Sequence, residues 1–422
     1  MEEKISFKSL PAFIILGIIT GLLIGIFKKI IGIISSFMDG FLTTGENQDK
    51  LIFMALIIAI GLITYFILKK DKNTKGSGIP VMAGMMEGTI DVSSEKTIIG
   101  KFIASVLTIG SGLTVGREGP SVHLGGLAGD IVGKFFPKVD RNLFIGSAAS
   151  SGFAVAFNAP VASLIFAVEE IFRNHNFNTF LTSAVTIISA TITSGLVFGD
   201  FPSLENIPVF ENIDQKSLWI ILALGIITGI SGVLFNKVVI GSKDIYKKIH
   251  LPEIVKYLSP FILTGLVLII DPRLFASGEE LIYLPSLGNE GIETLTYMYL
   301  AKIILLSLAF GIGLSGGSLV PLLAIGAILG NIYGTILSNL GLIPADMIFA
   351  ISLIAMAGHF SAIVRTPLTA IILILEMTGG AFSNILALAV VSFVAYLIAE
   401  IAKSEPFYED LYERLLITEK SS

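Results

Sequence analysis

The sequence predicts an all-α membrane protein that crosses the bilayer many times, and three observations lead to this class. Only 14% of the 422 residues are charged and 53% are hydrophobic, whereas soluble domains carry about 25% charged residues. The 43 glycines cluster inside apolar runs, which is typical of closely packed or broken membrane helices. Uncharged stretches long enough to span a hydrocarbon core about 30 Å thick recur along the chain, for example at residues 10–27, 217–236 and 381–399.

The composition excludes several kinds of functional site. The chain has no cysteine, which excludes disulfides, thiolate metal sites and cysteine nucleophiles. Its net charge of −5 comes without an acidic or basic tail, and it has no nucleic-acid signature. The histidines are scattered, so we expect local polar contacts from them and neither a metal site nor a cofactor; they are His123, His175, His250 and His359.

The distribution of lysines predicts the orientation of the chain. Lys69, Lys70, Lys72 and Lys75 form a dense basic cluster, whereas residues 45–50, one span earlier, are not basic. Basic loops stay in the cytoplasm. We therefore expect a multi-pass protein of the cell membrane with both termini in the cytoplasm. The N-terminal Met-Glu-Glu-Lys also lacks the basic start of a cleavable signal.

An internal repeat divides the chain. Pro120 and Pro321 are each followed by glycines five and nine residues later. Two proline-to-glutamate spacings of nine also match, from Pro160 to Glu169 and from Pro367 to Glu376. Two-fold repeats with discontinuous helices are typical of transporters, which hold their substrate where the halves meet. We expect one transmembrane domain over residues 1–422, with halves at about 50–200 and 216–401.

Three glycine-rich segments each open an apolar helix: Gly-Ser-Gly-Ile-Pro at 76–80, Gly-Arg-Glu-Gly-Pro at 116–120 and Gly-Gly-Ser-Leu-Val-Pro at 316–321. Each has proline within the first turn, where its missing N–H costs nothing. A helix start offers free N–H groups and partial positive charge to an anion. Several starts aimed at one point would bind an anion without a lysine or arginine, which could hold it too tightly for release. A soluble phosphate-binding loop could look like any one of them, but Gly-x-x-x-x-Gly-Lys-Ser/Thr is absent.

Glu118 carries the clearest functional signal, because it lies between two glycines at a helix start inside a membrane segment. An intramembrane carboxylate is costly and is a functional hypothesis by default. As an anion itself, it can occupy the N–H site meant for a substrate, and protonation should release it. Glu118 would then act as both gate and proton carrier. An Arg117–Glu118 pair that holds a loop is disfavoured, because adjacent helical residues do not face each other well.

Glu169 and Glu170 form a second carboxylate site, and the repeat separates their roles. Glu169 matches Glu376, so we expect both to be structural groups that accept hydrogen bonds. Glu170 matches Met377 and is therefore the additional carboxylate. It is a candidate proton relay, and the alternative is a helix end that emerges into water.

These motifs resemble those of the CLC family of chloride channels and chloride/proton antiporters. The resemblance also includes Phe-Asn-Ala-Pro at 157–160 and Leu-Glu-Met-Thr at 375–378, and it runs in order across essentially the whole chain. It implies an inverted-repeat fold with many tilted and half-spanning helices, and a homodimer with one pore per subunit. Because the sequence ends at Ser422, we expect none of the paired cytoplasmic regulatory domains of many eukaryotic members.

Carried over position by position, the resemblance implies a chloride site. Ser77 and Tyr408 would donate their hydroxyls, and the backbone N–H groups of Ser318 and Leu319 would complete the site. Tyr412 is a weaker candidate for the tyrosine. Residues 402–422 would thus be a cytoplasmic segment that contributes to the pore.

The same resemblance assigns the charged residues. Glu118 would be the external gating and proton-carrying glutamate, and Glu170 the internal proton glutamate that antiporters of the family usually keep. Lys101 and Arg117 match basic residues near the pathway and would add a potential favourable to an anion.

Two positions bear on how the anion is held. Leu319 stands where the family's third motif usually has phenylalanine; backbone donation does not need the ring, so we expect binding to survive. Serine at position 77 is associated with chloride in the family, and proline there with nitrate-preferring members.

The sequence therefore predicts a proton-coupled chloride antiporter that works with chloride, protons and membrane lipid. A passive chloride channel of the same fold is the first alternative, against which Glu118 and Glu170 argue. A membrane-embedded enzyme with paired carboxylates is the second. It is disfavoured because the sequence offers neither a metal-ligand cluster nor an activated nucleophile, so we expect no catalytic residues.

Overall fold

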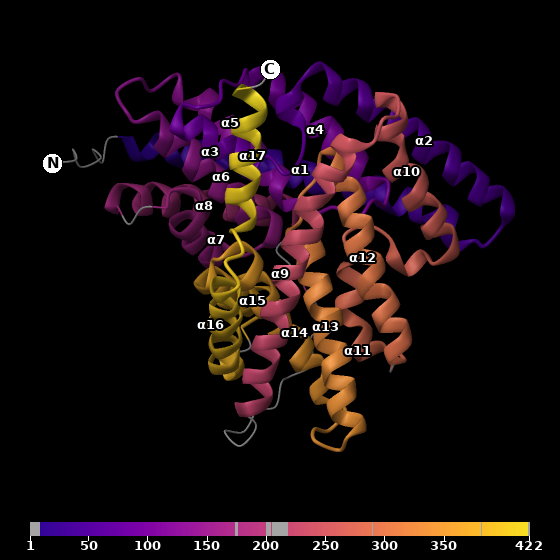
Figure 1. Ribbon diagram of the computed structural model, residues 1–422. Helices are drawn as coiled ribbons and strands as arrows, with labels where there is room; N and C mark the ends of the chain where they lie inside the picture. Colours follow the sequence, from indigo (N-terminus) through magenta and orange to yellow (C-terminus); the bar gives the residue numbers. More distant parts are fainter. Residues whose placement is uncertain are drawn as a thin grey trace.

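The computed structural model describes residues 9–173, 176–199, 204, 218–288, 290–380 and 382–420, and its regular elements are helices joined by turns (Figure 1). The α-helices are α1 (Leu10–Thr43), α2 (Asn47–Lys70), α3 (Ile79–Glu87), α4 (Ser94–Gly110), α5 (Glu118–Gly133), α6 (Arg141–Phe157), α7 (Pro160–Phe166), α8 (Phe177–Phe198), α9 (Leu218–Lys248), α10 (Glu253–Ile270), α11 (Leu284–Leu287), α12 (Ile292–Ile312), α13 (Leu319–Asn339), α14 (Met347–Val364), α15 (Pro367–Met377), α16 (Ile385–Ile401) and α17 (Phe407–Lys420). Short 3₁₀ turns are η2 (Lys72–Thr74), η5 (Pro272–Leu274), η6 (Glu279–Tyr283) and η7 (Phe382–Asn384), and η3 (Ala167–Ile171) is a π-helical turn.

Nine helices of the described ranges are long and apolar enough to cross a membrane, which confirms the predicted multi-pass fold. Others are too short to span it: α3 has 9 residues, α7 has 7 and α15 has 11. At about 1.5 Å per residue these reach only part of the way through a hydrocarbon core. Figure 1 also shows the helices inclined at widely different angles, as the fold class predicts. The polar segment at 201–216 lies outside the described residues, apart from Leu204.

The two halves of the chain repeat one order of elements in an inverted-repeat fold. A membrane helix ends in a 3₁₀ turn twice, and an aspartate side chain accepts a backbone N–H at each turn: Asp71 from Asn73 and Asp271 from Arg273. A pair of closely packed helices follows in each half, α5 with α6 and α13 with α14. A short helix led by proline then closes each unit, as α7 and α15.

Small residues allow the close approach inside each helix pair. A Cβ on Gly125 would lie 2.2 Å from the carbonyl oxygen of Ala148, and one on Gly326 would lie 2.9 Å from the Cβ of His359. These two glycines hold the same place in the two halves. Their role is to let α5 approach α6 and α13 approach α14.

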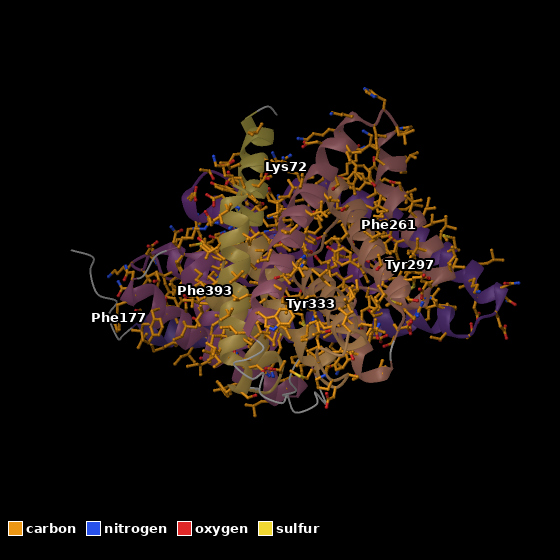
Figure 2. All side chains as sticks on the ribbon, turned by 60° about the horizontal axis from the view of Figure 1, so that its bottom comes forward. Lys72, Phe177, Phe261, Tyr297, Tyr333 and Phe393 are labelled. Atoms are coloured by element: carbon orange, nitrogen blue, oxygen red, sulfur yellow. The ribbon has the colours of Figure 1, made fainter. Side chains whose placement is uncertain are left out.

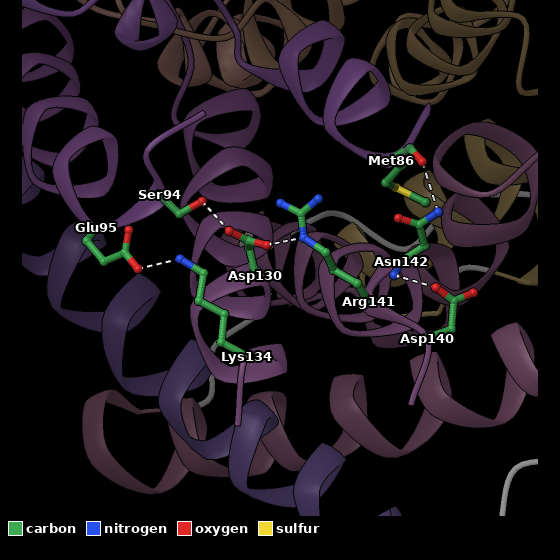
Figure 3. Close-up of polar contacts among 8 residues, drawn as sticks. All are labelled: Met86, Ser94, Glu95, Asp130, Lys134, Asp140, Arg141 and Asn142. Carbon is green, nitrogen blue, oxygen red and sulfur yellow. Dashed lines mark hydrogen bonds and ion pairs between the residues drawn. The ribbon is translucent and has the colours of Figure 1, made fainter. Parts of the chain in front are cut away.

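Polar contacts fix the far end of α5, the helix that begins at Glu118 (Figure 3). The buried Asp130 accepts hydrogen bonds from Ser94 of α4 and Arg141 of α6. Lys134 forms an ion pair with Glu95. Nearby, the side-chain amide of Asn142 donates to the backbone carbonyl of Met86. The carboxylate of Asp140 accepts the backbone N–H of Asn142. The ends of α3 to α6 are therefore tied together, which positions the start of α5.

Apolar side chains point outward around the molecule, as expected in lipid. Figure 2 shows Phe177 and Phe393 toward one side of the helical body and Tyr297 toward the other. Phe177 is 65% exposed, whereas Phe261 is fully buried between helices. The surface is thus adapted to a hydrocarbon surrounding.

Candidate functional site

The three glycine-rich helix starts meet in the interior. The N–H groups of Gly116 and Gly317 each donate to the other's carbonyl oxygen at 2.7 Å, forming an isolated antiparallel bridge. Gly76 donates to the carbonyl of Gly313 at 3.1 Å, and Gly316 donates to that of Gly76 at 3.2 Å. The starts of α3, α5 and α13 are therefore linked by backbone hydrogen bonds across the repeat.

Buried polar side chains without hydrogen-bond partners gather at this junction. The described residues offer no partner to the hydroxyls of Ser77, Ser318 and Tyr408 or to either carboxylate oxygen of Glu118. The hydroxyl of Tyr408 interacts with those of Ser77 and Ser318, but outside hydrogen-bond geometry. Leaving one such group unpaired costs about 1–3 kcal/mol, so a site with several of them is suited to a ligand that completes their bonding.

Glu118 lies folded against the bridge that joins the two halves. A Cβ on Gly116 would lie 2.2 Å from Oε2 of Glu118, and one on Gly119 would lie 2.3 Å from the Ser77 hydroxyl. Glycine is therefore needed on both sides of Glu118. The backbone N–H groups of Glu118 and Val320 interact with the carboxylate, again outside hydrogen-bond geometry. The carboxylate thus occupies a place next to the helix starts.

The two predicted basic residues have different surroundings. Arg117 Nε lies 3.8 Å from Glu118 Oε1, too far for a hydrogen bond, and its NH2 group donates to Glu279 at 3.0 Å. Lys101 is fully buried and donates to the carbonyls of Thr74 and Gly76, at 3.3 and 2.6 Å. Lys101 is therefore anchored behind the Ser77 loop, whereas Arg117 is paired with a second carboxylate.

Glu170 lies on the π-helical turn η3, which follows α7. Its side chain is buried and accepts a hydrogen bond from Arg173 at 3.0 Å, and Arg173 lies 3.7 Å from Glu409 of α17. A π-turn inside a helical segment is frequent at functional sites. Here it allows the adjacent carboxylates of Glu169 and Glu170 to point in different directions.

Glu169, next in the chain, faces the other half of the molecule. Its carboxylate accepts the N–H groups of Leu368 and Thr369 at the start of α15. Glu376 in turn accepts the N–H groups of Val161 and Ala162 at the start of α7. Each carboxylate caps the short helix of the opposite half.

Two cavities reach toward the site and differ in charge. One, of about 530 Å³, includes Ser77 and is lined mainly by cations; its charged lining residues are Lys72, Lys75, Lys243, Lys247, Glu253, Lys256 and Arg414. The other, of about 990 Å³, includes Glu170 and Tyr408 and has a mixed lining; its remaining charged residues are Glu87, Lys138, Asp140 and Arg173. Both contain residues of α3 and α17, so they open on one face of the molecule.

The structure thus places the predicted residues in separate groups. Ser77, Glu118, Ser318 and Tyr408 come together, with Leu319 buried beside them at the start of α13. Tyr412 is apart from this group: it donates to Glu87 at 2.6 Å near the surface.

Sequence reasoning missed a second loop of the same type. Lys302 is fully buried and donates to the carbonyls of Leu274 and Ala276, at 2.8 and 2.7 Å, as Lys101 does to the Ser77 loop. Ala276 donates to the carbonyl of Gly112 at 2.9 Å. The signal was present, since Ser277-Gly278 follows Asp271 at the spacing at which Ser77-Gly78 follows Asp71.

Helix starts that meet at a buried polar site inside a multi-pass inverted repeat define a membrane transport protein. The comparisons with known proteins identify the family. The chain belongs to the voltage gated chloride channel family, whose model matches residues 60–400.

Curated relatives align with nearly the whole chain. It is 31% identical to the H(+)/Cl(−) exchange transporter ClcA of Vibrio campbellii, over 98% of the chain and 91% of that protein. It is 30% identical to the ClcA protein of Citrobacter koseri, over 98% of the chain and 90% of that protein.

Solved structures share the fold. A slow cyanobacterial Cl−/H+ antiporter superimposes with a TM-score of 0.90 at 26% identity, covering 98% of this chain and 99% of that one. A CLC-type fluoride/proton antiporter gives a TM-score of 0.81 at 22% identity, covering 96% and 99%, and shows the fold alone.

Proposed function

We propose that this protein is a proton-coupled chloride antiporter of the cell membrane. The observation that carries the proposal is the group of buried, unpartnered polar side chains at the junction of three helix starts, reached by two cavities of different charge. Relatives that align with almost the whole chain are named H(+)/Cl(−) exchange transporters, which agrees with it.

Chloride takes the basic cavity. Five lysines and an arginine line it, so it concentrates anions before they reach Ser77. The hydroxyls of Ser77 and Tyr408 and the N–H groups of Ser318 and Leu319 then hold the ion, with Lys101 adding positive potential from behind the loop. No lysine or arginine among the described residues takes part directly, which keeps the ion releasable.

Protons take the other cavity. Glu170 faces it together with Tyr408, and it exchanges its proton with Glu118 past this tyrosine. Ionised Glu118 competes with chloride for the helix starts, and protonated Glu118 leaves them. Coupling follows because the carboxylate cannot occupy the anion site and carry a proton at the same moment.

The basic face of the molecule is cytoplasmic. Lys72 and Lys75, which follow α2, line the basic cavity together with Lys243 and Lys247 near the end of α9 and Lys256 near the start of α10, as the positive-inside bias predicts for a cytoplasmic face. The start of α1 and the helix α17 border the adjacent cavity on the same face. We therefore assign both termini to the cytoplasm, and the C-terminal segment that begins at residue 402 contributes to the pore through Tyr408.

The functional unit is a homodimer. The short helices α7 and α15 contact each other, and each exposes an apolar side chain, Val161 and Leu368. A second copy of the chain would cover these apolar side chains, whereas Glu169 and Glu376 are already hydrogen-bonded to each other's helix starts. Further apolar side chains flank α7 and α15 on α8 and α16, such as Ile188 and Phe393.

Reconstitution tests the function. Liposomes containing the protein and high internal chloride are diluted into low chloride, with valinomycin holding the membrane potential near zero. Antiport predicts that chloride leaving the liposomes drives protons in, so the outside pH rises and a protonophore reverses the rise. Chloride efflux without proton movement would identify a passive channel instead.

A further inference from the structure

A partly exposed carboxylate, Glu279, lies on the side of the site opposite the basic cavity. Glu253 and Lys256, near the start of α10, line the basic cavity, and α10 then runs 18 residues, about 27 Å, to the other face. Glu279 follows there, in η6. Its side chain is 37% exposed and accepts a hydrogen bond from Arg117 at 3.0 Å.

Four charged side chains form this side of the site, which we call the outer mouth: Lys28, Arg117, Glu118 and Glu279. Lys28 of α1 donates to the carbonyl of Val155 at 2.8 Å and interacts electrostatically with the other three. With all four ionised, two cations face two carboxylates and the net charge is zero. The inner, basic cavity differs, because only one of its seven charged lining residues is acidic.

Few other charges are near Glu279. The helices packed against η6 are α11, α13 and α14; their titratable residues are Tyr333 and His359, and none of the three helices carries a Lys, Arg, Asp or Glu. Arg273 of η5 is paired with Asp271 and Glu290. Glu280, the next residue, is exposed and interacts with Lys302. Arg117 is therefore the cation that Glu279 contacts directly, whereas Lys28 interacts with Glu279 without forming an ion pair.

We propose that Glu279 sets the affinity of the outer mouth for chloride by holding Arg117 in an ion pair. This inference rests on the proposed transport function. A free guanidinium beside Glu118 would attract chloride and slow its release. The ion pair presents a dipole in place of a net charge, so the outer side binds chloride more weakly than the basic inner side. Glu279 is a positioning residue for Arg117 and is not itself a proton carrier.

The Glu279→Gln variant tests this inference. Reconstitution at less than one protein per liposome, with capture on a C-terminal tag, separates vesicles that present the inner face outside from those that present the outer face. Initial chloride flux is then measured against chloride on each side. We expect the outer KM to fall about three- to tenfold, the size expected when a charge at a binding mouth loses its partner, with kcat and the proton-to-chloride ratio unchanged.

A matched control separates this pair from a general effect of surface charge. Glu280→Gln removes the same charge one residue away but leaves the Arg117 pair intact, so its outer KM should stay near that of the wild type. Equal shifts in both variants, or no shift in Glu279→Gln, would overturn the proposal. Wild-type protein that exchanges no protons for chloride would instead refute the proposed function.

A double variant tests the route of action. In an Arg117→Gln background the Glu279→Gln change should have at most a small further effect on the outer KM, because the directly paired cation is gone and only Lys28 remains. An effect of full size in that background would show that Glu279 acts on chloride without Arg117 and would overturn the proposal. Thermal melts with equal midpoints establish that the compared variants are folded.

Discussion

The starts of α5 and α13 share a backbone but differ in chemistry. Gly116 and Gly317 are bonded to each other, and a proline follows four residues after each. Between them, α5 presents Arg117 and Glu118 where α13 presents Ser318 and Leu319. The duplicated scaffold supplies helix starts on both sides of the site, and only one copy adds a titratable group.

The same division holds in the rest of the repeat. Glu169 and Glu376 are shared by the halves, and each caps the opposite half's short helix. Glu170 has no counterpart, because Met377 takes its place. We infer that matched residues maintain the fold, whereas unmatched carboxylates couple protons to the anion. The predictions below test this division, beginning with the largest effect.

The unmatched Glu170 should be needed for coupling alone. Glu170→Gln should lower proton movement by about 100-fold or more, the size typical of removing an acid–base group, while chloride flux continues. The measurement is pH and chloride electrode traces on the same liposomes. Glu409→Gln is the control, because Glu409 is an exposed carboxylate that also lies near Arg173. This variant should keep the coupling of protons to chloride. Full coupling in Glu170→Gln would mean that protons enter by another route.

The two serine loops should differ in anion binding. Ser77→Ala removes a hydroxyl from the proposed chloride site, and a hydrogen bond to a charged group contributes about 1.5–3 kcal/mol. We expect chloride affinity, measured by calorimetry, to weaken about 10- to 150-fold. Ser277→Ala changes the matching loop of the other half and should leave the chloride affinity unaltered. Equal losses in both variants would contradict the proposed location of the site.

The two buried lysines should support the fold equally. Lys101→Met and Lys302→Met each leave two buried carbonyl oxygens without their donor, at a cost of about 1–3 kcal/mol per group. Thermal unfolding in detergent should show similar losses for both. Weaker chloride binding should accompany Lys101→Met only, since Lys101 lies behind the Ser77 loop. If chloride binding weakened in Lys302→Met alone, the loop anchored by Lys302, and not the Ser77 loop, would belong to the chloride site.

The smallest effect on transport should come from Leu319→Phe. In the proposed site, chloride meets the backbone N–H at this position and not the side chain, so we expect the inner KM for chloride to change less than about twofold. Leu319 is fully buried, and the larger ring should lower stability by about 1–3 kcal/mol. A large change in KM at unchanged stability would show that the side chain shapes the inner path.

Much of this arrangement follows from local sequence, and some of it cannot. Glycine, proline and an isolated carboxylate predict the helix starts and Glu118, because each signal lies within a few residues. The Arg117–Glu279 pair joins residues 162 positions apart, and Glu279 lies in a polar turn that has no local signal of function. The π-turn at Glu170 and the reciprocal caps of Glu169 and Glu376 likewise depend on packing between the halves.

The loop at Ser277 shows a different limit. Its local sequence matches the Ser77 loop only in Ser-Gly, so the comparison needs Asp271 and Lys302 as further markers, and these are identified by the contacts they make. By contrast, Tyr408 and Tyr412 both belong to α17, and burial separates them: Tyr408 is 2% exposed, whereas Tyr412 bonds to Glu87 near the surface.

The most direct test is proton pumping by the wild type and by Glu118→Gln in matched liposomes under one outward chloride gradient. The wild type should drive protons inward against their gradient. Its chloride flux should also rise on acidification, because protonation releases the carboxylate from the helix starts. Glu118→Gln should carry chloride at a rate independent of pH and move no protons. Proton pumping that persists in Glu118→Gln would contradict the claim that this one carboxylate joins the two pathways.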